Sequence, residues 1–356
     1  MTLRQLTLLN YKNIEEAELI FSPKINCLIG QNGEGKTNLL DAIHFLSFTK
    51  SAFNSIDSQI IRHEQPYMML KGIYESGNDT EEISCALQTG KRKNFRRNGK
   101  EYKKFSEHIG LIPLIMISPS DSELIIGGSE NRRRFIDMTI SQFNPIYIAS
   151  LARYAKALQQ KNIMLKAEEE PNVEVISMYE EIMAETGEYI FKERDKFIND
   201  FIPFFQKYYS FISGNHENVS IKYTSHGQRG PLLSTIQNNR YKERIVGYSL
   251  YGVHKDDLEM LIDSYPIKRE GSQGQNKTYL IALKLAQFEF IKKSNKSNSP
   301  ILLLDDIFDK LDATRVSNII NLVSKESFGQ IFITDTNREH LDVILQQTTN
   351  TNYKIY

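Results

Sequence analysis

The sequence predicts an α/β domain assembled from both ends of the chain and interrupted by a mostly helical insertion. Three observations support this fold class. Short apolar or alternating segments, which are typical of strands, are frequent before residue 120. Long stretches with apolar residues at three- and four-residue spacing follow, as in amphipathic helices. Strand-like and helical segments then alternate again. We therefore expect an N-terminal part at 1–120, a helical arm at 121–247 and a C-terminal part at 248–356.

Individual elements follow from the same patterns. The first strong unit is a short buried strand at 25–29, a Gly-rich loop from Gly30, and a helical pattern from about Lys36. Asn98-Gly99 is a two-residue hairpin turn signal, and a Glu-Glu-Glu-Pro run separates two long helical patterns. The other expected strands are 3–10, 17–21, 68–74, 82–88, 94–97, 112–117, 219–224, 301–304 and 330–334. The other expected helices are 132–141, 145–166, 172–204, 232–247 and 277–293.

Composition limits the class of protein. The chain is 40% apolar and 25% charged, with 44 basic and 44 acidic residues and no net charge. This balance excludes a globally basic nucleic-acid coat, although DNA binding through a local basic face stays open. No apolar run approaches the roughly 18 residues that span a bilayer, and the N-terminus lacks the apolar core of a secretory signal. Two cysteines, Cys27 and Cys85, argue against structural zinc or a disulfide scaffold. We expect a cytoplasmic protein without a membrane partner.

Residues 30–37 match the pattern G-x-x-x-x-G-K-[ST] at each defined position. Glycines permit the positive-φ backbone that turns successive N–H groups toward one anion, and a helix N-terminus adds partial positive charge. A chance Gly-rich turn is the alternative, but the strand before it and the helix after it favour nucleotide binding. Lys36 would reach the β- and γ-phosphates, and the Thr37 hydroxyl would bind Mg²⁺. The expected nucleotide-binding residues are Gly30, Gln31, Asn32, Gly33, Glu34, Gly35, Lys36 and Thr37.

The strand expected at 301–304 is fully apolar and ends in two carboxylates, Asp305 and Asp306. Such a run is typical of a central parallel strand, whose carboxyl end lies beside the phosphate loop. Asp305 would then bind Mg²⁺ through water. Asp306 would polarise the attacking water, which makes it the expected catalytic residue together with Lys36. The alternative is that the two acids are simply solvated at an exposed strand end. The presence of a phosphate loop in the same chain makes this alternative less favoured.

A Ser-x-Gly-Gln segment precedes the helix expected at 277–293. A Ser and a Gly at a helix start usually form only an N-cap. The order of this segment, a helix and then an acid-ending strand, however, resembles the signature and Walker B segments of ABC-type ATPases. The resemblance implies that Ser272, Gly274 and Gln275 bind the γ-phosphate held by the phosphate loop of another subunit. It also implies that Asp312 belongs to a D-loop at the same interface, and that the chain forms an ATP-dependent homodimer.

Five segments, in order along the whole chain, carry a further resemblance. They are LNYKN at 9–13, GGSENRRRFID at 127–137, YAKALQQKN at 154–162, GVHKDD at 252–257 and SQGQ at 272–275. The first resembles the opening of SMC-like DNA-repair ATPases. The other four resemble motifs of bacterial RecF proteins, which are ABC-type ATPases without the long coiled coil of SMC proteins. The resemblance therefore implies an ABC-type ATPase head with an inserted helical arm.

This resemblance also implies a function. RecF proteins bind duplex and gapped DNA and act with RecR and RecO to load RecA at single-strand gaps. The cofactors implied are ATP and Mg²⁺. The partners implied are DNA, RecR and RecO, and indirectly RecA, in DNA repair and replication-fork maintenance after DNA damage.

Departures from the family pattern qualify these expectations. Ser129 stands where the family often has Pro, and Asn54 where many relatives have Arg. Lys161 and Lys255 replace Arg, which weakens any bidentate contact. The switch His of transporter ATPases is missing after the last buried strand, and Asp306 is one methylene shorter than their usual Glu. These last two features favour slow hydrolysis, with ATP used as a dimerisation switch.

Basic residues crowd the predicted hairpin at 91–104. One interpretation is a surface that contacts DNA phosphates without reading sequence. The other is a solvated hairpin edge that is protected by its charges. The candidate DNA-binding residues are Lys91, Arg92, Lys93, Arg96 and Arg97.

Two other charged segments have open interpretations. Arg132-Arg133-Arg134 could bind DNA or could anchor the insertion onto the head through ion pairs with acidic residues of the chain. His254 with Asp256-Asp257 superficially resembles a metal cluster, but we expect a hydrogen-bonded loop there. For the whole chain, the alternatives to a DNA-binding ATPase are an ATP-binding scaffold that does not hydrolyse and, less favoured, a transporter-type ATPase subunit.

Overall fold

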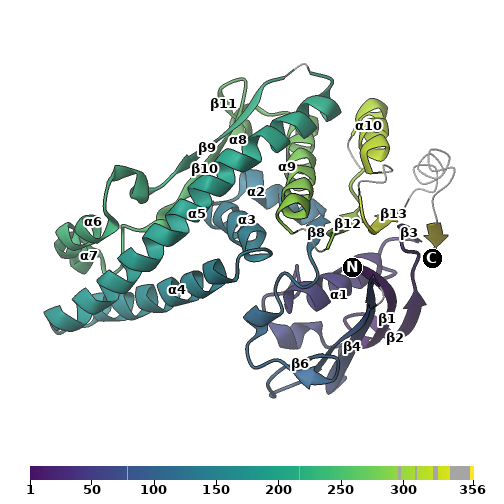
Figure 1. The fold of residues 1–356 in the computed structure, drawn as a ribbon, viewed down its shortest axis with the longest axis horizontal. Coiled ribbons are helices and arrows are strands. Elements are labelled where there is room, and N and C mark those ends of the chain that lie inside the picture. The colour runs from purple at the N-terminus through teal and green to yellow at the C-terminus, as the bar shows by residue number, and fades with distance from the viewer. Residues whose placement is uncertain (78, 216, 296–297, 309–310, 324–327, 337–352) are drawn as a thin grey trace. The chain divides into compact units, whose positions relative to one another are not determined.

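The computed structural model describes residues 1–77, 79–215, 217–295, 298–308, 311–323, 328–336 and 353–356, and the chain divides into two compact units (Figure 1). The first unit contains Met1–Asp121, Phe211–Asn215 and Gln273–Tyr356, and the second contains Ser122–Ser210 and His216–Ser272. An α/β unit from both chain ends and a second, inserted unit agree with the predicted fold class.

A parallel sheet carries the candidate nucleotide site in the first unit. Its strand order is β14-β3-β13-β12-β8, and each printed pair is parallel. Strands β8, β12 and β13 are buried along their whole length and are apolar except for the residues that end β12 and β13, as expected for strands covered on both faces. The strands are β3 (Ile25–Ile29), β8 (Leu114–Ile117), β12 (Ile301–Asp305), β13 (Ile331–Asp335) and β14 (Tyr353–Ile355). The loop after β3 and the acidic residues at the end of β12 therefore lie at the same edge of the sheet, where the strands have their carboxyl ends. Strand β13 lies between β3 and β12.

An antiparallel sheet forms the other layer of the first unit, in the order β2-β1-β4-β5-β6-β7. Buried and exposed residues alternate along β4, as the sequence predicts. Asn98 and Gly99 connect β6 to β7 with φ of 50° and 77°, which suits the predicted two-residue turn. The strands are β1 (Thr2–Tyr11), β2 (Ile14–Ile20), β4 (Tyr67–Ser76), β5 (Asp79–Gln88), β6 (Asn94–Arg97) and β7 (Lys100–Glu101).

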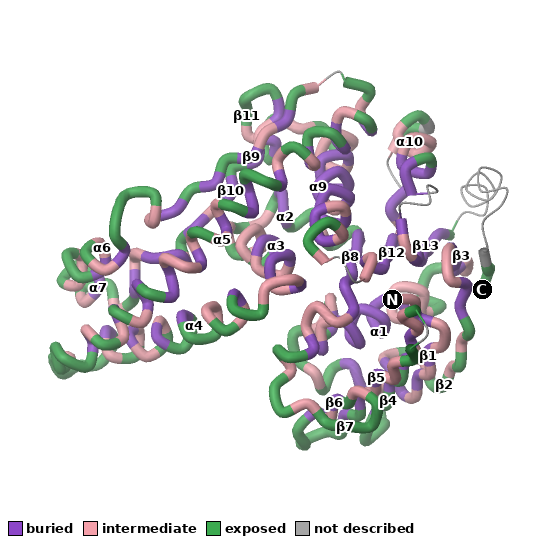
Figure 2. The backbone as a smooth tube through the Cα atoms, in the orientation of Figure 1, coloured by how far each residue is buried: buried purple, intermediate pink, exposed green. Residues whose placement is uncertain are grey.

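Helix α1 (Lys36–Phe48) contributes to the hydrophobic core between these two sheets. Helix α9 (Gln273–Ser294) is buried along most of its length (Figure 2). It begins four residues before the predicted 277–293, so the Ser-x-Gly-Gln segment enters the first turn of the helix. Helix α10 (Ala313–Val323) follows β12. Short 3-10 helices in this unit are η1 (Asp57–Ile60) and η2 (Phe105–Glu107), and η3 (Pro119–Ser122) crosses into the second unit.

Two antiparallel helices form the long part of the second unit, α4 (Pro145–Lys166) and α5 (Val173–Ser213). Asn144, at the start of α4, hydrogen-bonds Glu193, whereas Arg153 pairs with Glu185 further along. The N-cap Asn144 and Pro at the first helical position explain where α4 begins. Helix α5 was expected to end at 204, but it continues to Ser213. Pro203 lies inside the helix and removes only one backbone N–H donor, so the helix is not ended there.

Shorter elements complete the second unit. Its helices are α2 (Glu123–Ile126), α3 (Ser129–Ser141), α6 (Leu232–Asn238), α7 (Arg240–Val246) and α8 (Ile267–Glu270), with the 3-10 helices η4 (His226–Arg229) and η5 (Val253–Lys255). Its strands are β9 (Val219–Thr224), β10 (Asp257–Ile262) and β11 (Tyr265–Pro266), in the order β11-β10-β9. No helix among the described ranges has the length and apolar content to cross a bilayer.

The end of the second unit differs from the expected boundary at 247. Strand β10 pairs antiparallel with all six residues of β9, from Asp257 opposite Thr224 to Ile262 opposite Val219. This pairing explains why the segment after 247 packs with the insertion and not with the first unit. The sequence indicated only that strands and helices alternate again after 247, and no strand was expected at 257–262.

Asp41, in α1, is the polar centre of the core of the first unit. Its side chain is fully buried and lies 2.7 Å from Lys12 Nζ. It also accepts hydrogen bonds of 2.7 Å from Tyr11 Oη, Ser51 Oγ and the Ala52 amide. Burial raises the pKa of Asp41, but the Lys12 ammonium and these hydrogen bonds outweigh it, so the pKa lies below its usual value. The carboxylate thus ties α1 to the end of β1 and to the loop at 51–52.

We predict that Asp41→Asn lowers the free energy of unfolding by about 3 kcal/mol, because it leaves the Lys12 ammonium unpaired near the core. Since the folded-state pKa of Asp41 is lowered, its stabilisation is complete above the unfolded pKa of about 4 and is lost as pH falls through the folded pKa. Wild type and variant should therefore converge in acid. Chemical denaturation at several pH values measures this.

Glu75→Gln is the matched control, because Glu75 forms a partly exposed pair with Arg4 at 2.5 Å. Its cost should stay under about 1 kcal/mol. Equal losses for the two variants would contradict the role given to Asp41.

Candidate nucleotide-binding site

The loop between β3 and α1 has the backbone conformation that an anion cradle requires. Gly33 and Gly35 have φ of 92° and 97°, in the left-handed region that favours glycine. A Cβ at Gly33 would meet no atom within 4 Å, so φ and not space requires glycine there. The loop borders a cavity of about 230 Å³, whose lining is Asn32, Gly33, Gly35, Lys36, Thr37, Asn38 and Asp306.

Two charged side chains of the loop bind the loop itself. Lys36 Nζ donates to the carbonyls of Gly30 and Gln31, at 2.6 and 2.8 Å. Glu34 Oε2 accepts from the Gln31 amide at 2.8 Å. One backbone amide of the loop thus already binds a carboxylate oxygen.

The sheet brings Asp305 to the phosphate loop. Thr37 Oγ1 donates to Asp305 Oδ1 at 3.0 Å, and Thr334 Oγ1 donates to the same oxygen at 2.7 Å. Burial raises the pKa of Asp305, while these two hydrogen bonds and the Lys36 charge act against the shift. Because hydroxyl and carboxylate oxygens are ligands that Mg²⁺ accepts, the residues present fit a magnesium–nucleotide.

Asp306 lies on the cavity wall and has an unusual backbone. Its φ is 46°, which is rare for a residue other than glycine, and its amide donates to Thr334 Oγ1 at 3.1 Å. Burial raises the pKa of its carboxyl, with contributions from Asp305 and Asp335, against the opposing charges of Lys36 and Lys277. A carboxyl with a raised pKa beside a phosphate cradle is suited to accept a proton from water.

Two residues of this site had no predicted role. Asn13 Nδ2 donates to the Gly33 carbonyl at 3.0 Å, and Asn38 Nδ2 donates to Asn13 Oδ1 at 2.7 Å. A Cβ at Gly35 would lie 3.1 Å from Asn13 Oδ1. The turn after β1 therefore braces the phosphate loop. The only sequence signal was the LNYKN segment, which carried a resemblance but no assignment for Asn13.

The residues expected to act on another subunit are not part of this cavity lining. Ser272 is exposed and directly precedes α9, and Gly274 and Gln275 lie in its first turn. Asp312 Oδ1 accepts from the Arg315 amide at 2.9 Å, which caps the start of α10. Asp309 and Lys310, which precede Leu311 and Asp312, lie outside the described residues.

The basic hairpin does not present all five candidate charges. Lys93 is buried, and its Nζ donates to the Thr49 carbonyl and pairs with Asp57 at 2.8 Å. The expectation that Lys93 contacts DNA is therefore wrong in this fold, because its ammonium is used inside the unit. Arg97 forms a two-point pair with Glu81 across the sheet. Lys91, Arg92 and Arg96 are the exposed members of the predicted set.

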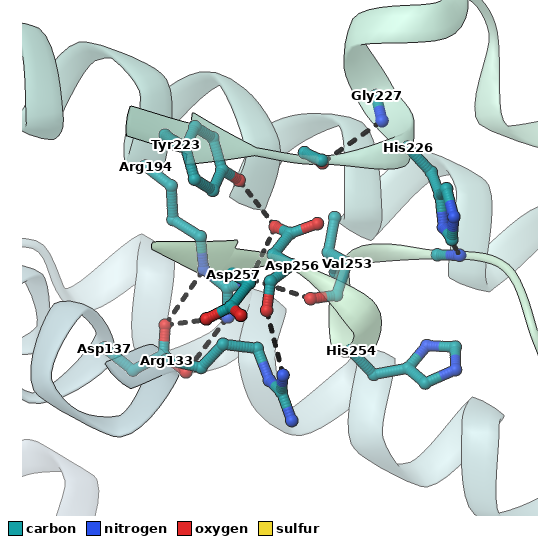
Figure 3. Close-up of polar contacts among 12 residues, drawn as sticks. Arg133, Asp137, Arg194, Tyr223, His226, Gly227, Val253, His254, Asp256 and Asp257 are labelled. Carbon is teal, nitrogen blue, oxygen red and sulfur yellow. Dashed lines mark hydrogen bonds and ion pairs between the residues drawn. The ribbon is translucent and has the colours of Figure 1, made fainter. Parts of the chain in front are cut away.

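Arg132 and Arg133 bind residues of the HxDD turn (254–257) in the second unit, and Figure 3 shows Arg133 beside Asp256 and Asp257. Arg132 pairs with both oxygens of Asp257, at 2.6 and 3.0 Å. Arg133 Nη1 donates to the Asp256 carbonyl at 2.9 Å. Both contacts lie within the second unit, so they support a structural role for Arg132 and Arg133 inside the insertion and do not test anchoring onto the head.

Arg194 of α5 is the centre of this network. Its guanidinium contacts both oxygens of Asp137 at 2.9 and 3.0 Å, Asp256 at 2.7 Å and the Val253 carbonyl at 2.8 Å. Tyr223 Oη donates to Asp256 as well. Burial raises the pKa of Asp256, and the Arg194 charge opposes this shift. No group of metal-ligating side chains occurs among the residues that the structure describes, and the HxDD turn is the hydrogen-bonded loop that was expected.

Comparison with known proteins agrees with this geometry. The family model described as RecF/RecN/SMC N terminal domain matches residues 2–355. The chain is 57% identical over 357 residues to the DNA replication and repair protein RecF of Phocaeicola vulgatus, covering 100% of this chain and 96% of the relative. It is 47% identical to the RecF of Flavobacterium johnsoniae, covering 100% and 99% of the two chains.

Solved structures give the same result for the fold. The structure of the recombination mediator protein RecF-ATP in the RecFOR pathway aligns with a TM-score of 0.87 at 28% identity, over 94% of this chain and 92% of that one. An Smc head bound to the C-winged helix domain of ScpA aligns with a TM-score of 0.57 at 16% identity, over 100% and 94% of the chains, and shares the fold alone. The predicted ABC-type head with an inserted arm is confirmed.

Proposed function

The chain belongs to the RecF/RecN/SMC family, and from this premise we propose that it is an ATP-dependent DNA-binding protein of recombinational repair and replication-fork maintenance. The observation that carries the proposal is the meeting of Thr37 with Asp305 at 3.0 Å, beside a glycine cradle and Asp306. This arrangement suits a triphosphate.

Each residue has a defined task in the proposed site. The loop amides and the α1 N-terminus would bind the phosphates, and Lys36 would exchange its two loop carbonyls for phosphate oxygens. Thr37 and Asp305 would hold Mg²⁺, which when bound neutralises charge on the phosphates. Asp306 would orient the attacking water and take its proton. Asn13 would keep Gly33 in place.

We propose that ATP hydrolysis is slow and that it returns the ATP-bound dimer to monomers. Asp306 has a shorter reach than a glutamate, and Thr336 follows Asp335 where a transporter ATPase has its switch His. Two copies would close over shared nucleotides, each lending Ser272 and the start of α9 to the phosphates of its partner. Buried triphosphate would then stabilise the dimer through binding, and its loss would release it.

DNA and partner proteins complete the proposal. The recombination mediator RecF structure is described as part of the RecFOR pathway. By analogy, we infer that this chain binds duplex and gapped DNA and helps RecO and RecR to load RecA at single-strand gaps. The exposed residues of the basic hairpin are the proposed phosphate contacts.

We predict that Asp306→Asn lowers the ATP turnover number at least about 100-fold while ATP affinity changes less than threefold, because it removes the base and not the cradle. Because the pKa of Asp306 is raised, its carboxylate becomes protonated at a higher pH than that of an ordinary aspartate. As pH is lowered, the ATPase activity should therefore begin to fall at a correspondingly higher pH. Steady-state hydrolysis with and without gapped duplex, and nucleotide titration, measure both. Equal, measurable turnover for variant and wild type would contradict the role given to Asp306, and no turnover in either protein would support the non-hydrolysing scaffold.

We predict that Ser272→Arg abolishes ATP-dependent dimerisation. The larger, charged side chain would block the position proposed to receive the γ-phosphate of the partner. Sedimentation velocity with ATP and then ADP should give a dimer only for wild type with ATP. Ser294→Arg, the same change at the exposed end of α9, is the matched control and should dimerise normally. Identical profiles for all samples would refute the shared site.

We predict that Lys91→Glu with Arg96→Glu weakens DNA binding and reduces the slope of log affinity against log salt by about two, the value for two lost phosphate contacts. Fluorescence anisotropy with duplex DNA at several salt concentrations tests this. Lys192→Glu with Lys196→Glu on α5 controls for net charge. If the Lys91→Glu, Arg96→Glu variant has the same salt slope as wild type, the hairpin does not contact DNA, and its charges only protect the edge of the sheet.

A further inference from the structure

One arginine joins the two segments that are proposed to reach the nucleotide of another copy. Arg315 lies in the first turn of α10, three residues after Asp312. Gly274 lies in the first turn of α9. Both helices belong to the first unit, so the contacts among these residues lie within one compact body. The two segments therefore meet through a side chain that no sequence motif singled out.

Arg315 holds the Asp312 carboxylate at both of its oxygens. The Arg315 amide donates to Asp312 Oδ1 at 2.9 Å, and Arg315 Nε lies 3.3 Å from Asp312 Oδ2. The Asp312 side chain is 58% exposed, whereas that of Arg315 is 19% exposed. An exposed carboxylate would otherwise exchange among rotamers, and contacts at both oxygens restrict this exchange. Asp312 is therefore accessible from outside and held in one orientation.

The far end of the Arg315 side chain lies against Gly274. A Cβ on Gly274 would lie 3.1 Å from Arg315 Nη1, which is closer than most Cβ contacts. Gly274 is not one of the glycines with positive φ, so its backbone would accept alanine. Alanine would also favour the helix over glycine. The close approach of the guanidinium, and not the backbone conformation, is therefore what glycine provides at this position.

The start of α9 is also fixed from inside the first unit. Thr278 is fully buried, and its Oγ1 donates to the Gly274 carbonyl at 2.8 Å. Most of α9 beyond this turn is buried as well. Since close-packed helices shift less easily than the end of a long side chain, a larger residue at 274 would displace the Arg315 guanidinium first.

Helix α10 has a second anchor that does not involve Arg315. Asn318 Nδ2 donates to the carbonyls of Phe211 and Ile212, each at 3.3 Å. These two carbonyls belong to the segment Phe211–Asn215 of the first unit. Without the Arg315 side chain, α10 should therefore still fold in place, and only the contacts of that side chain should be lost.

The charge of Arg315 does not account for its position. A cation is disfavoured near the N-terminus of a helix, where the helix dipole is positive. Arg315 lies in the first turn of α10 and beside the first turn of α9, and neither first turn contains an acidic residue. The Asp312 carboxylate offsets part of this cost, and a phosphate that arrived at both helix starts would offset more. The contacts of the guanidinium explain the arginine better than its charge does.

We propose that Arg315 is a positioning residue, which keeps Asp312 and the segment Ser272–Gln275 in the one arrangement that meets the triphosphate of a partner copy. This inference rests on the proposed function, because it assumes that both segments act on another subunit. The guanidinium is planar with nitrogens that point in different directions, so one side can hold Asp312 while the other lies on Gly274. A lysine has one terminal nitrogen and cannot do both. Because pre-arranged groups lower the cost of association, the effect should fall on dimerisation and not on ATP binding by a single copy.

Arg315→Ala and Arg315→Lys test the proposal, with Arg4→Ala and Arg4→Lys as matched controls. Arg4 pairs with Glu75 at 2.5 Å in the same unit. Sedimentation velocity over a range of protein concentrations, with ATP and Mg²⁺, gives the dimer dissociation constant. Nucleotide titration at low protein concentration gives the ATP affinity of the single copy. Both Arg315 variants should raise the dimer dissociation constant about tenfold or more, with ATP affinity within about twofold of wild type. The Arg4 variants should match wild type in both measurements.

Gly274→Ala tests the contact itself. Alone, the new Cβ should displace the guanidinium and weaken dimerisation. Added to Arg315→Ala, it should weaken dimerisation no further, because the contact is already lost. It should then raise the melting temperature, because alanine favours the helix and the guanidinium no longer crowds it. In the presence of Arg315, this rise should be smaller or reversed.

Three results would overturn the proposal while the wider function stands. Arg315→Lys could dimerise like wild type, so that charge alone suffices. The effects of Gly274→Ala and Arg315→Ala on dimerisation could add. ATP affinity of the single copy could fall as much as dimerisation does. If wild type forms no ATP-dependent dimer, the proposed function fails and the positioning role fails with it. The melting temperatures would then still show whether Arg315 contacts Gly274, so the two failures can be told apart.

Discussion

A single carboxylate oxygen, Oδ1 of Asp305, joins the two halves of the candidate nucleotide site. It accepts from Thr37 at the start of α1 and from Thr334 near the end of β13. These residues meet because β3, β13 and β12 are parallel neighbours whose registers end at one edge. A slip of β12 by one residue would turn Asp305 to the opposite face of the sheet and separate it from both threonines. The cavity, Asp306 and the proposed metal ligands all depend on this alignment.

Local signals in the sequence were sufficient for the parts of the site that are contiguous. The buried run at 25–29 and the glycine pattern of 30–37 predict the limits of the strand, the loop and the start of the helix correctly. The acids after the 301–304 run were placed correctly for the same reason. That β13 lies between β3 and β12 is a matter of long-range pairing, and no periodicity encodes it. The role of Thr334 was therefore invisible in the sequence.

Charge patterns were the least informative signals. Eight basic residues crowd one hairpin, yet Lys93 is turned inward to Asp57 and Thr49. Its neighbours Arg92 and Lys91 are exposed, although the sequence gives all three the same appearance. Arg132 and Arg133 likewise form structural pairs with residues more than 120 positions away. Which of several similar cations is buried depends on the tertiary position of an acid, and local sequence does not specify this.

The contact between Glu34 and the Gln31 amide has a consequence for ligand exchange. Any phosphate that takes this amide must first displace a tethered carboxylate, so the amide keeps an acceptor both before and after the ligand arrives. A phosphate that binds this amide therefore replaces the Glu34 carboxylate. Because the carboxylate competes for the amide, it reduces the net affinity of the loop for phosphate. The same side chain can return to the Gln31 amide when the anion leaves.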